Sequence, residues 1–116
     1  MSQKKILVID DEDFFHEVIK EGLGDRVTIL SVFSIEEAEE VFSANPDLCL
    51  IVMDACVPGD SPTTPPLVRR IRESFNGPII ATSSLDTYRR KLMEAGCDHE
   101  STKLKLPEKI IAILGL

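Results

Sequence analysis

The segment Leu48-Cys-Leu-Ile-Val-Met-Asp54 decides how this sequence folds, because six apolar residues run directly into one carboxylate. Val57, Pro58 and Gly59 follow at once, so the run does not continue. A short apolar run bounded by turn residues is typical of a central β-strand that is buried on both faces. Asp54 then stands at the carboxyl end of that strand, which is the edge where open α/β sheets bind their ligands.

Further strand-like runs and amphipathic helical patterns alternate along the chain. The strands are predicted at residues 6–9, 27–32, 48–54, 78–83 and 97–102. A helix is expected after each of them, and the last two helices span 86–95 and 107–114. This alternation predicts parallel strands joined by right-handed crossovers. We therefore expect an α/β fold of the flavodoxin-like (βα)5 doubly wound type, a sandwich with a five-stranded parallel sheet in the order 2-1-3-4-5.

Local signals mark several helix ends and faces. Ser34 and Glu37 form a Ser-x-x-Glu capping box, and Thr64 is predicted to cap a helix that starts at Pro65. His16 is predicted on the exposed side of the first helix, and Arg89-Arg-Lys91 on the solvated face of the fourth. The first helix is expected to bury Phe15, Val18, Ile19 and Leu23. Residues 58–66 contain four prolines and are predicted to form a stiff loop.

The composition is that of an ordinary soluble domain, and residues 1–116 are predicted to form one. No apolar run approaches the roughly 20 residues that a membrane-spanning helix needs. The formal net charge of −7 argues against direct nucleic acid binding and against binding to a membrane surface. Cys49, Cys56 and Cys97 lack the paired spacing of a zinc site, and a reducing, cytoplasmic compartment is the simple interpretation. The sequence leaves the oligomeric state open between a monomer and a weak dimer.

Five polar side chains follow or end the predicted strands. Because the carboxyl ends of parallel strands share one edge, the fold is expected to bring together Asp10, Asp11, Asp54, Thr82 and Lys103. Carboxylates in one pocket raise one another's pKa unless a cation lies among them. Oxygen ligands favour Mg²⁺ or Ca²⁺, and Mg²⁺ is usually held by one or two carboxylates with waters and phosphate oxygens.

The same residue types suit phosphoryl chemistry. A carboxylate can attack phosphorus and form an aspartyl phosphate. Lys103 would neutralise one phosphoryl oxygen, and the Thr82 hydroxyl would donate a hydrogen bond to another. Mg²⁺ would offset the remaining negative charge.

Most of these residues also have a purely structural explanation. Asp10 and Asp11 place negative charge in the first turn of a helix, which the helix dipole favours. Thr82 is a good strand former, and Lys103 is compatible with a solvated loop. Asp54 is the exception, because a lone carboxylate at the end of a buried strand is costly without a partner.

Over essentially its whole length, the chain resembles the receiver domain of two-component response regulators, a CheY-like family. The resemblance rests on the order and spacing of several short pieces. These are Ile6-Leu-Val-Ile-Asp-Asp-Glu12, Ile51-Val-Met-Asp54, Pro58-Gly59, Ile79-Ile-Ala-Thr82, Gly96-Cys-Asp98 and Lys103.

The resemblance implies that Asp54 accepts a phosphoryl group from a phosphohistidine of a sensor histidine kinase or phosphotransfer protein. Asp10, Asp11, Asp54 and the backbone carbonyl of Cys56 would hold Mg²⁺. Thr82 and Lys103 would bind the phosphoryl oxygens. A downstream output protein or domain would be engaged through residues 86–114, and the chain would promote its own phosphorylation and dephosphorylation without turning over an external substrate.

The sequence departs from the family pattern at three points. Leu104 follows Lys103 where the family usually has a proline in a cis bond, and Lys105 is a second candidate for the lysine role. Glu100 occupies the position of the family's switch aromatic in the fifth strand. The loop from Asp60 to Pro66 is about two residues longer than usual. The phosphorylation residues are therefore present, while the output machinery is altered.

Two other classes of function, a binding module and an enzyme, share this fold or its aspartate. A receiver that acts as a phosphorylation-independent interaction module is supported by Glu100 and Leu104. An aspartyl-phosphate hydrolase of the haloacid-dehalogenase type needs a second aspartate two positions after the first, where this chain has Cys56. A flavin-binding electron carrier needs a phosphate-binding loop after the first strand, where this chain has four acids.

Overall fold

A parallel sheet of five strands forms the centre of the protein in a computed structural model that describes residues 3–59 and 61–116. The strands are β1 (Lys4–Ile9), β2 (Val27–Val32), β3 (Leu50–Asp54), β4 (Ile79–Thr82) and β5 (His99–Ser101). Their order is β2-β1-β3-β4-β5, so the predicted flavodoxin-like topology is confirmed. The central strand β3 pairs with β1 and β4, and all five of its residues are buried.

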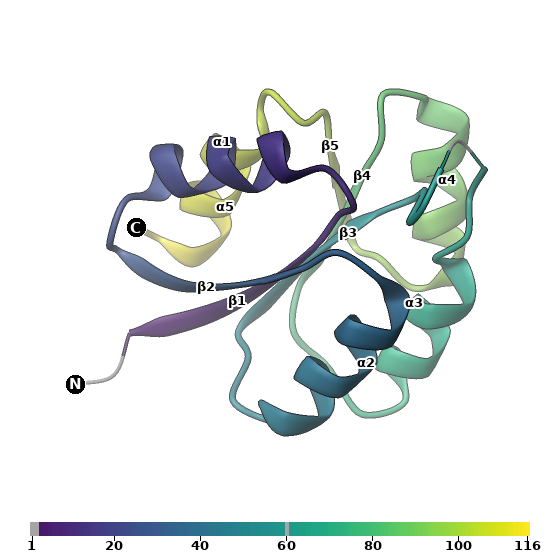
Figure 1. Ribbon diagram of the computed structural model, residues 1–116, viewed down its shortest axis with the longest axis horizontal. Coiled ribbons are helices and arrows are strands. Elements are labelled where there is room, and N and C mark those ends of the chain that lie inside the picture. Colours follow the sequence, from purple (N-terminus) through teal and green to yellow (C-terminus); the bar gives the residue numbers. More distant parts are fainter. Residues whose placement is uncertain (1–2, 60) are drawn as a thin grey trace.

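Helices cover both faces of the sheet. They are α1 (Asp13–Leu23), α2 (Ile35–Ala44), α3 (Pro65–Arg72), α4 (Asp86–Ala95) and α5 (Leu106–Leu114). Figure 1 shows α1 and α5 together on one side of the strands, with α2, α3 and α4 on the other. None of the helices in the described part of the chain is long and apolar enough to span a bilayer.

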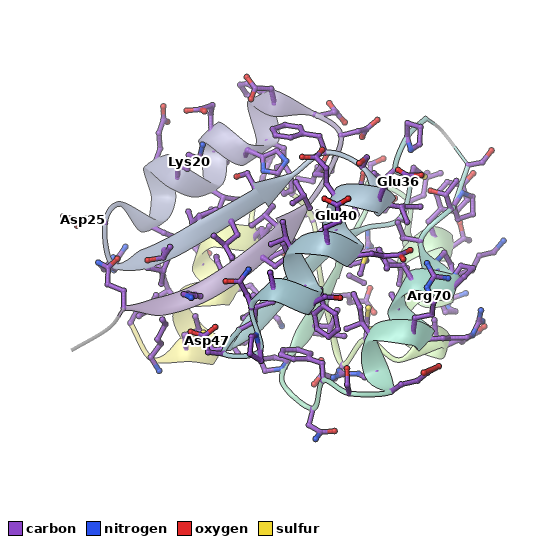
Figure 2. The ribbon with its side chains drawn as sticks, turned by 60° about the horizontal axis from the view of Figure 1, so that its bottom comes forward. Lys20, Asp25, Glu36, Glu40, Asp47 and Arg70 are labelled. Carbon is purple, nitrogen blue, oxygen red and sulfur yellow. The ribbon has the colours of Figure 1, made fainter. Side chains whose placement is uncertain are left out.

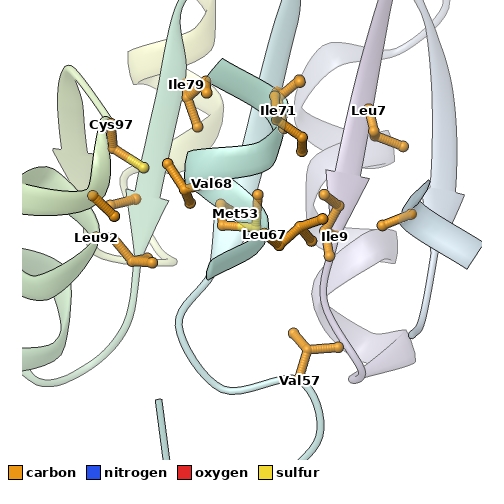
Figure 3. Close-up of a cluster of buried hydrophobic side chains, with 14 of the residues drawn as sticks. Leu7, Ile9, Met53, Val57, Leu67, Val68, Ile71, Ile79, Leu92 and Cys97 are labelled. Carbon is orange, nitrogen blue, oxygen red and sulfur yellow. The ribbon is translucent and has the colours of Figure 1, made fainter. Parts of the chain in front are cut away.

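The apolar side chains form one hydrophobic core on each face of the sheet. Successive residues of a strand point to opposite faces, so Leu7 and Ile9 of β1 join one core while Ile6 and Val8 join the other. Figure 3 shows the first of these cores, in which side chains of α3 and α4 meet those of the strands. The first core includes Ala55 and Val57, which follow β3, so apolar packing reaches the carboxyl edge of the sheet on that face.

The outer faces of the helices carry the charges. Figure 2 shows Glu36 and Glu40 on α2 and Arg70 on α3, away from the core. Arg70 pairs with Glu39 at 2.6 Å, but both side chains are half exposed. Such an ion pair contributes at most about 1 kcal/mol to stability.

The two predicted helix caps differ in outcome. The Ser34 hydroxyl accepts a hydrogen bond from the Glu37 amide at 3.1 Å, as predicted. The Glu37 carboxylate in turn accepts a hydrogen bond from the amide of Phe33 at 3.2 Å, and Phe33 lies one residue before the N-cap.

Thr64 occupies the N-cap position of α3, but the prediction that its side chain caps the helix is wrong. Its backbone is already in the helical region (φ −96°, ψ −9°), where the hydroxyl does not reach the first-turn amides. The buried hydroxyl donates instead to the carbonyls of Asp54 at 2.7 Å and Ala55 at 3.2 Å. Thr64 therefore ties the proline-rich loop to the end of β3. Asp60, in the same loop, lies outside the described residues.

The predicted exposure of His16 is also wrong, because its side chain is fully buried. Its Nε2 lies 2.8 Å from the Asp10 carbonyl oxygen, and its ring centroid is 4.3 Å from that of Phe33. The carbonyl gives Nε2 a partner, whereas Nδ1 is buried without a hydrogen bond, so the cost of burying the ring is only partly offset. His16 thus takes the place in the buried face that was predicted for Val18, which is only partly buried.

Gly22 marks a close approach of α1 to α5. A Cβ added at Gly22 would lie 2.6 Å from the Cβ of Pro107, closer than two carbon atoms can pack. We predict that Gly22→Ala lowers the free energy of unfolding by about 1–3 kcal/mol, although alanine favours helices. Urea denaturation followed by circular dichroism measures this change. Glu21→Ala, at an exposed position of the same helix, should change it by less than about 0.5 kcal/mol. Equal stability of the Gly22 variant and the wild type would contradict the close contact.

Candidate functional site

A cavity of about 740 Å³ opens at the carboxyl edge of the sheet. Its wall is built mainly by the ends of β1, β3, β4 and β5 and the loops that follow them, where the predicted site residues lie. It is lined by Asp11, Glu12, Asp54, Cys56, Gly59, Ser83, Ser84, Leu85, Tyr88 and Lys103. Residues far apart in the sequence therefore meet at this edge, as the strand order requires.

Asp54 is the last residue of β3, and its side chain is 7% exposed. Burial raises the pKa of this carboxyl from its ordinary 3.8 to about 7, and the negative charges of Asp10 and Asp11 add to the increase. The ammonium of Lys103 and the backbone amide of Cys56 act in the opposite direction but do not cancel it. Near neutral pH, the Asp54 carboxyl is consequently only partly ionised, because burial disfavours its charged form.

Asp10 follows β1 and is fully buried. Its Oδ1 accepts a hydrogen bond from the Glu12 amide at 2.9 Å, and its Oδ2 lies 2.9 Å from the Lys103 ammonium. Burial raises the pKa of Asp10, and these two contacts lower it by less than burial raises it. His16 fixes the backbone of the same residue through its carbonyl oxygen. Hydrogen bonds to both the main chain and the side chain therefore fix the position of Asp10.

Asp11 is more exposed than Asp10 and faces the cavity. Its Oδ2 accepts a hydrogen bond from the Gly59 amide at 3.3 Å. This bond joins the loop after β1 to the loop after β3, across the mouth of the cavity. The carboxylates of Asp10, Asp11 and Glu12 each offer one oxygen, and these three oxygens lie within 4.8 Å of one another.

Lys103 brings its ammonium into this acidic group. Its Nζ lies 2.9 Å from Asp10, 3.3 Å from Glu12 and 3.9 Å from Asp54. It also lies 4.7 Å from the centre of the Phe15 ring, a favourable cation–π position. Burial alone would lower the pKa of Lys103, but the hydrogen bond to Asp10 and the charges of Asp54 and Asp10 raise it. Lys105, the second candidate, is exposed and does not line the cavity.

Thr82 pairs with Asp54 across β3 and β4, but its hydroxyl does not face the cavity. The side chain is fully buried, and Oγ1 lies 3.4 Å from the carbonyl oxygen of Met53. In this structure the Thr82 hydroxyl donates to that carbonyl and to no group of Asp54 among the described residues. Cys56 lines the cavity two residues after Asp54, so its carbonyl is close enough in the chain to serve with that carboxylate.

The charge balance of the cavity suits a divalent cation. Every candidate ligand is an oxygen atom, and the pKa of Asp54 is strongly raised, first by burial and then by the negative charges of Asp10 and Asp11. A hard cation would favour the ionised form of Asp54, and it prefers this donor set. Asp10, Asp11, Asp54 and the Cys56 carbonyl therefore fit Mg²⁺. Their roles as ligands stay predictions.

Several residues of the cavity were not predicted as site residues. Glu12 contacts Lys103, while Ser83, Ser84 and Tyr88 form the wall on the α4 side. Glu12 and the two serines directly follow predicted site residues in the sequence, which is the signal that could have identified them. Tyr88 carries no such signal, because only the orientation of α4 brings it to the cavity.

Two positions at which the chain departs from the family pattern, Glu100 and Leu104, do not line this cavity. Leu104 is 86% exposed. Within residues 3–59 and 61–116 the one cis peptide bond is Val57–Pro58, so the Lys103–Leu104 bond is trans. Glu100 of β5 binds Arg89 of α4 at 3.0 Å. The prediction that Arg89 is simply solvated is therefore wrong, since its side chain is only 15% exposed.

Solved structures with the same fold are response regulators and receiver domains. A two-component response regulator from Clostridium difficile is 25% identical, each chain is 97% covered, and the TM-score is 0.81. A response regulator from Burkholderia pseudomallei with a phosphorylated aspartic acid, calcium ion and citrate is 22% identical over 97% of this chain and 66% of its own, with a TM-score of 0.80.

A third similar structure contains a complex. It is the co-crystal structure of the Saccharomyces cerevisiae histidine phosphotransfer signaling protein Ypd1 with the receiver domain of its downstream response regulator Ssk1. The match is 20% identical over 97% of this chain and 89% of the other, with a TM-score of 0.77. No protein-family model and no curated protein sequence matches the chain. The predicted resemblance to receiver domains is thereby confirmed at the level of the fold.

The raised pKa of Asp54 predicts a pH-dependent gain in stability from Asp54→Asn. Because the folded-state pKa of about 7 exceeds the ordinary 3.8, the ionised group destabilises the metal-free protein increasingly as the pH rises between these values. Asp54→Asn removes this cost, so its free energy of unfolding should match the wild type near pH 4. At pH 8 it should exceed the wild type by on the order of 1–3 kcal/mol.

Urea unfolding at a series of pH values, with chelator present, measures this difference. Asp25→Asn makes the same charge change at an exposed turn at the opposite edge of the sheet, and should show no such gain. A gain that does not grow with pH would show that the Asp54 carboxylate is adequately compensated.

Proposed function

We propose that this chain is a two-component receiver that accepts a phosphoryl group on the carboxylate of Asp54. The donor would be a phosphohistidine on a sensor histidine kinase or phosphotransfer protein. The observation that carries the proposal is the placement of Asp54, which is buried at the end of the central strand, 3.9 Å from the Lys103 ammonium, in a cavity with Asp11. The structure of a receiver in complex with Ypd1 supports this class of partner.

In the proposed reaction, one Asp54 carboxylate oxygen attacks phosphorus. A bond between this oxygen and phosphorus forms while the phosphorus–nitrogen bond of the phosphohistidine breaks, and the bond electrons leave with the imidazole. Hydrolysis later returns Asp54 to the carboxylate and releases inorganic phosphate. The chain would promote both steps on itself and would not turn over an external substrate.

The residues around Asp54 would supply position and charge. Lys103 already lies between Asp10 and Asp54, and it would bind a phosphoryl oxygen as a point charge. The Thr82 hydroxyl would leave Met53 and donate a hydrogen bond to a second oxygen. Mg²⁺ would be held by Asp10, Asp11, Asp54 and the Cys56 carbonyl. Its charge would keep Asp54 ionised and offset the charge of the transferred group.

In the proposed switch, the movement of Thr82 changes the conformation of a partner-binding surface. Ser83 and Ser84 follow Thr82 and line the cavity, so a displacement of Thr82 shifts the loop that leads into α4. The readout would be a partner-binding surface within residues 86–114. A downstream output protein or domain would bind there.

A second candidate function is a phosphorylation-independent interaction module with the same fold. The observations that favour it are the Thr82 hydroxyl, which faces Met53, and Glu100, which pairs with Arg89. In this alternative the partner affinity would not depend on Asp54. Phosphorylation-dependent partner binding separates the two candidates.

Incubation with Mg²⁺ and acetyl phosphate should add one phosphoryl group to the wild type and none to Asp54→Asn. The reason is that Asp54 lines the cavity at the end of β3, with Lys103 at 3.9 Å. Intact-mass spectrometry measures the adduct. Asp25→Asn should react as the wild type does. An adduct on both the wild type and Asp54→Asn would contradict the choice of Asp54, and no adduct on any of them would favour the interaction module.

Removal of the divalent cation should prevent the adduct. Excess chelator leaves the raised pKa of Asp54 without compensation, so the nucleophile is partly protonated near neutral pH. Calorimetric titration should detect Mg²⁺ binding to the wild type, and Asp11→Asn should weaken it by about tenfold or more because one charged ligand is lost. Asp25→Asn is again the matched control. Unchanged Mg²⁺ affinity in Asp11→Asn would exclude this carboxylate as a ligand.

A further inference from the structure

Arg89 is bonded to two parts of the protein that belong to different surfaces. Its Nη1 donates to the Ser83 carbonyl at 2.5 Å, and its Nε donates to Glu100 Oε1 at 3.0 Å. Ser83 lines the cavity of Asp54. Glu100 lies in the edge strand β5 and lines a separate groove of about 460 Å³. One guanidinium group thus connects the candidate phosphorylation site to the groove.

We propose that Arg89 is a positioning residue that couples phosphorylation of Asp54 to the edge strand β5. This inference rests on the function proposed above and specifies how the signal leaves the site. The coupling element is a hydrogen-bonded ion pair, which stands where the family is expected to use an aromatic side chain.

The rigidity of the guanidinium makes this coupling possible. Its donors lie in one plane and at fixed separations, so Nη1 and Nε cannot follow two acceptors that move apart. A displacement of the Ser83 carbonyl by about 1 Å takes a hydrogen bond beyond its normal length. Arg89 must then either lose its hydrogen bond to the Ser83 carbonyl, or move with that carbonyl and lose its hydrogen bond to Glu100.

The connections of Ser83 lead the displacement to Arg89. Thr82 is held to β3, because its carbonyl accepts a bond from the Ala55 amide at 3.1 Å. Beyond it, the Ser83 hydroxyl accepts a bond from the Leu85 amide at 3.2 Å, a contact within the same loop. Among the described residues, Arg89 is the side chain that joins this loop to β5. Thr82 also pairs with Ser101 of β5 in the sheet. Arg89 therefore adds a side-chain connection from the loop after Thr82 to Glu100 of β5, beside the backbone pairing.

Loss of the Arg89–Glu100 ion pair would change the charge that the groove presents to a partner. It is lined by Arg89, Glu100, Ser101, Thr102, Lys105, Glu108, Lys109 and Ala112. The Glu100 side chain is 48% exposed even when it is paired. Without Arg89 at 3.0 Å, its carboxylate presents an additional uncompensated negative charge to a partner. Because the pair is partly exposed, the coupling should weaken as the salt concentration rises.

The test compares the wild type, Arg89→Met and Arg90→Met by nuclear magnetic resonance, with and without acetyl phosphate and Mg²⁺. Arg90 is the matched control, because it is a neighbouring exposed arginine on the same helix. The adduct on Asp54 is measured by intact mass in the same samples. The signals to follow are the backbone amides of His99, Glu100 and Ser101.

We expect all three proteins to form the adduct. In the wild type and in Arg90→Met, phosphorylation should shift the β5 amide signals. In Arg89→Met, the same shifts should fall by about threefold or more, which is the loss of coupling expected when one connecting contact is removed. Glu100→Gln keeps the bond from Arg89 to Ser83 but loses the ion pair, so its β5 shifts should fall as well and should no longer depend on salt.

The outcomes separate the two proposals. An adduct with equal β5 shifts in the wild type and Arg89→Met would overturn the coupling role of Arg89 and leave the proposed function intact. No adduct on the wild type would overturn the proposed function, and the coupling role with it. A merely structural role for Arg89 predicts lower thermal stability of Arg89→Met with undiminished β5 shifts, which this experiment also detects.

Discussion

The burial of two carboxylates beside one ammonium constrains the whole carboxyl edge of the sheet. Asp10 and Asp54 are almost completely shielded from water, and Lys103 lies within 4 Å of both. Burial raises the pKa values of both carboxyls, and the positive charge of Lys103 lowers them by less than burial raises them. A folded protein tolerates such a cost only where the surrounding structure is stable enough, and here the core that includes Ala55 and Val57 extends up to this edge.

The same constraint explains the contacts that hold the loops in place. Asp11 accepts from Gly59, Thr64 donates to the carbonyls of Asp54 and Ala55, and His16 binds the carbonyl of Asp10. Each of these contacts fixes a backbone segment next to a charged group. The acidic residues are thereby prevented from moving apart to relieve their repulsion, which is the condition that makes a site receptive to a cation and a phosphoryl group.

Much of this arrangement could be predicted from the sequence, because it depends on simple periodicity and on topology. The apolar run from Leu48 to Met53 identifies a central strand, and the rule that ligands bind at the carboxyl edge then places Asp54 beside Asp10 and Lys103. The count of residues from Gly96 favoured Lys103 over Lys105, and Lys103 is the lysine that lines the cavity. These predictions succeed because they require only that the strands be parallel and in the expected order.

The remaining features depend on partners that a sequence pattern does not reveal. His16 is buried because a carbonyl oxygen is available at Asp10, and Thr64 bonds to β3 because its backbone is helical rather than extended. Arg89 is shielded because Glu100 and the Ser83 carbonyl lie within its reach. The direction of the Thr82 hydroxyl is set by the backbone of β3. In each case the decisive group comes from another element of the fold.

The titration of the Asp54 carboxyl carbon, followed by ¹³C nuclear magnetic resonance with and without Mg²⁺, tests the central claim most directly. Without a divalent cation, the carboxyl should titrate with a pKa of about 7, and Mg²⁺ should lower that pKa because it favours the ionised form. A pKa near the ordinary 3.8 that does not respond to Mg²⁺ would contradict the account. It would mean that the carboxylate is already compensated and that this edge of the sheet does not need a cation.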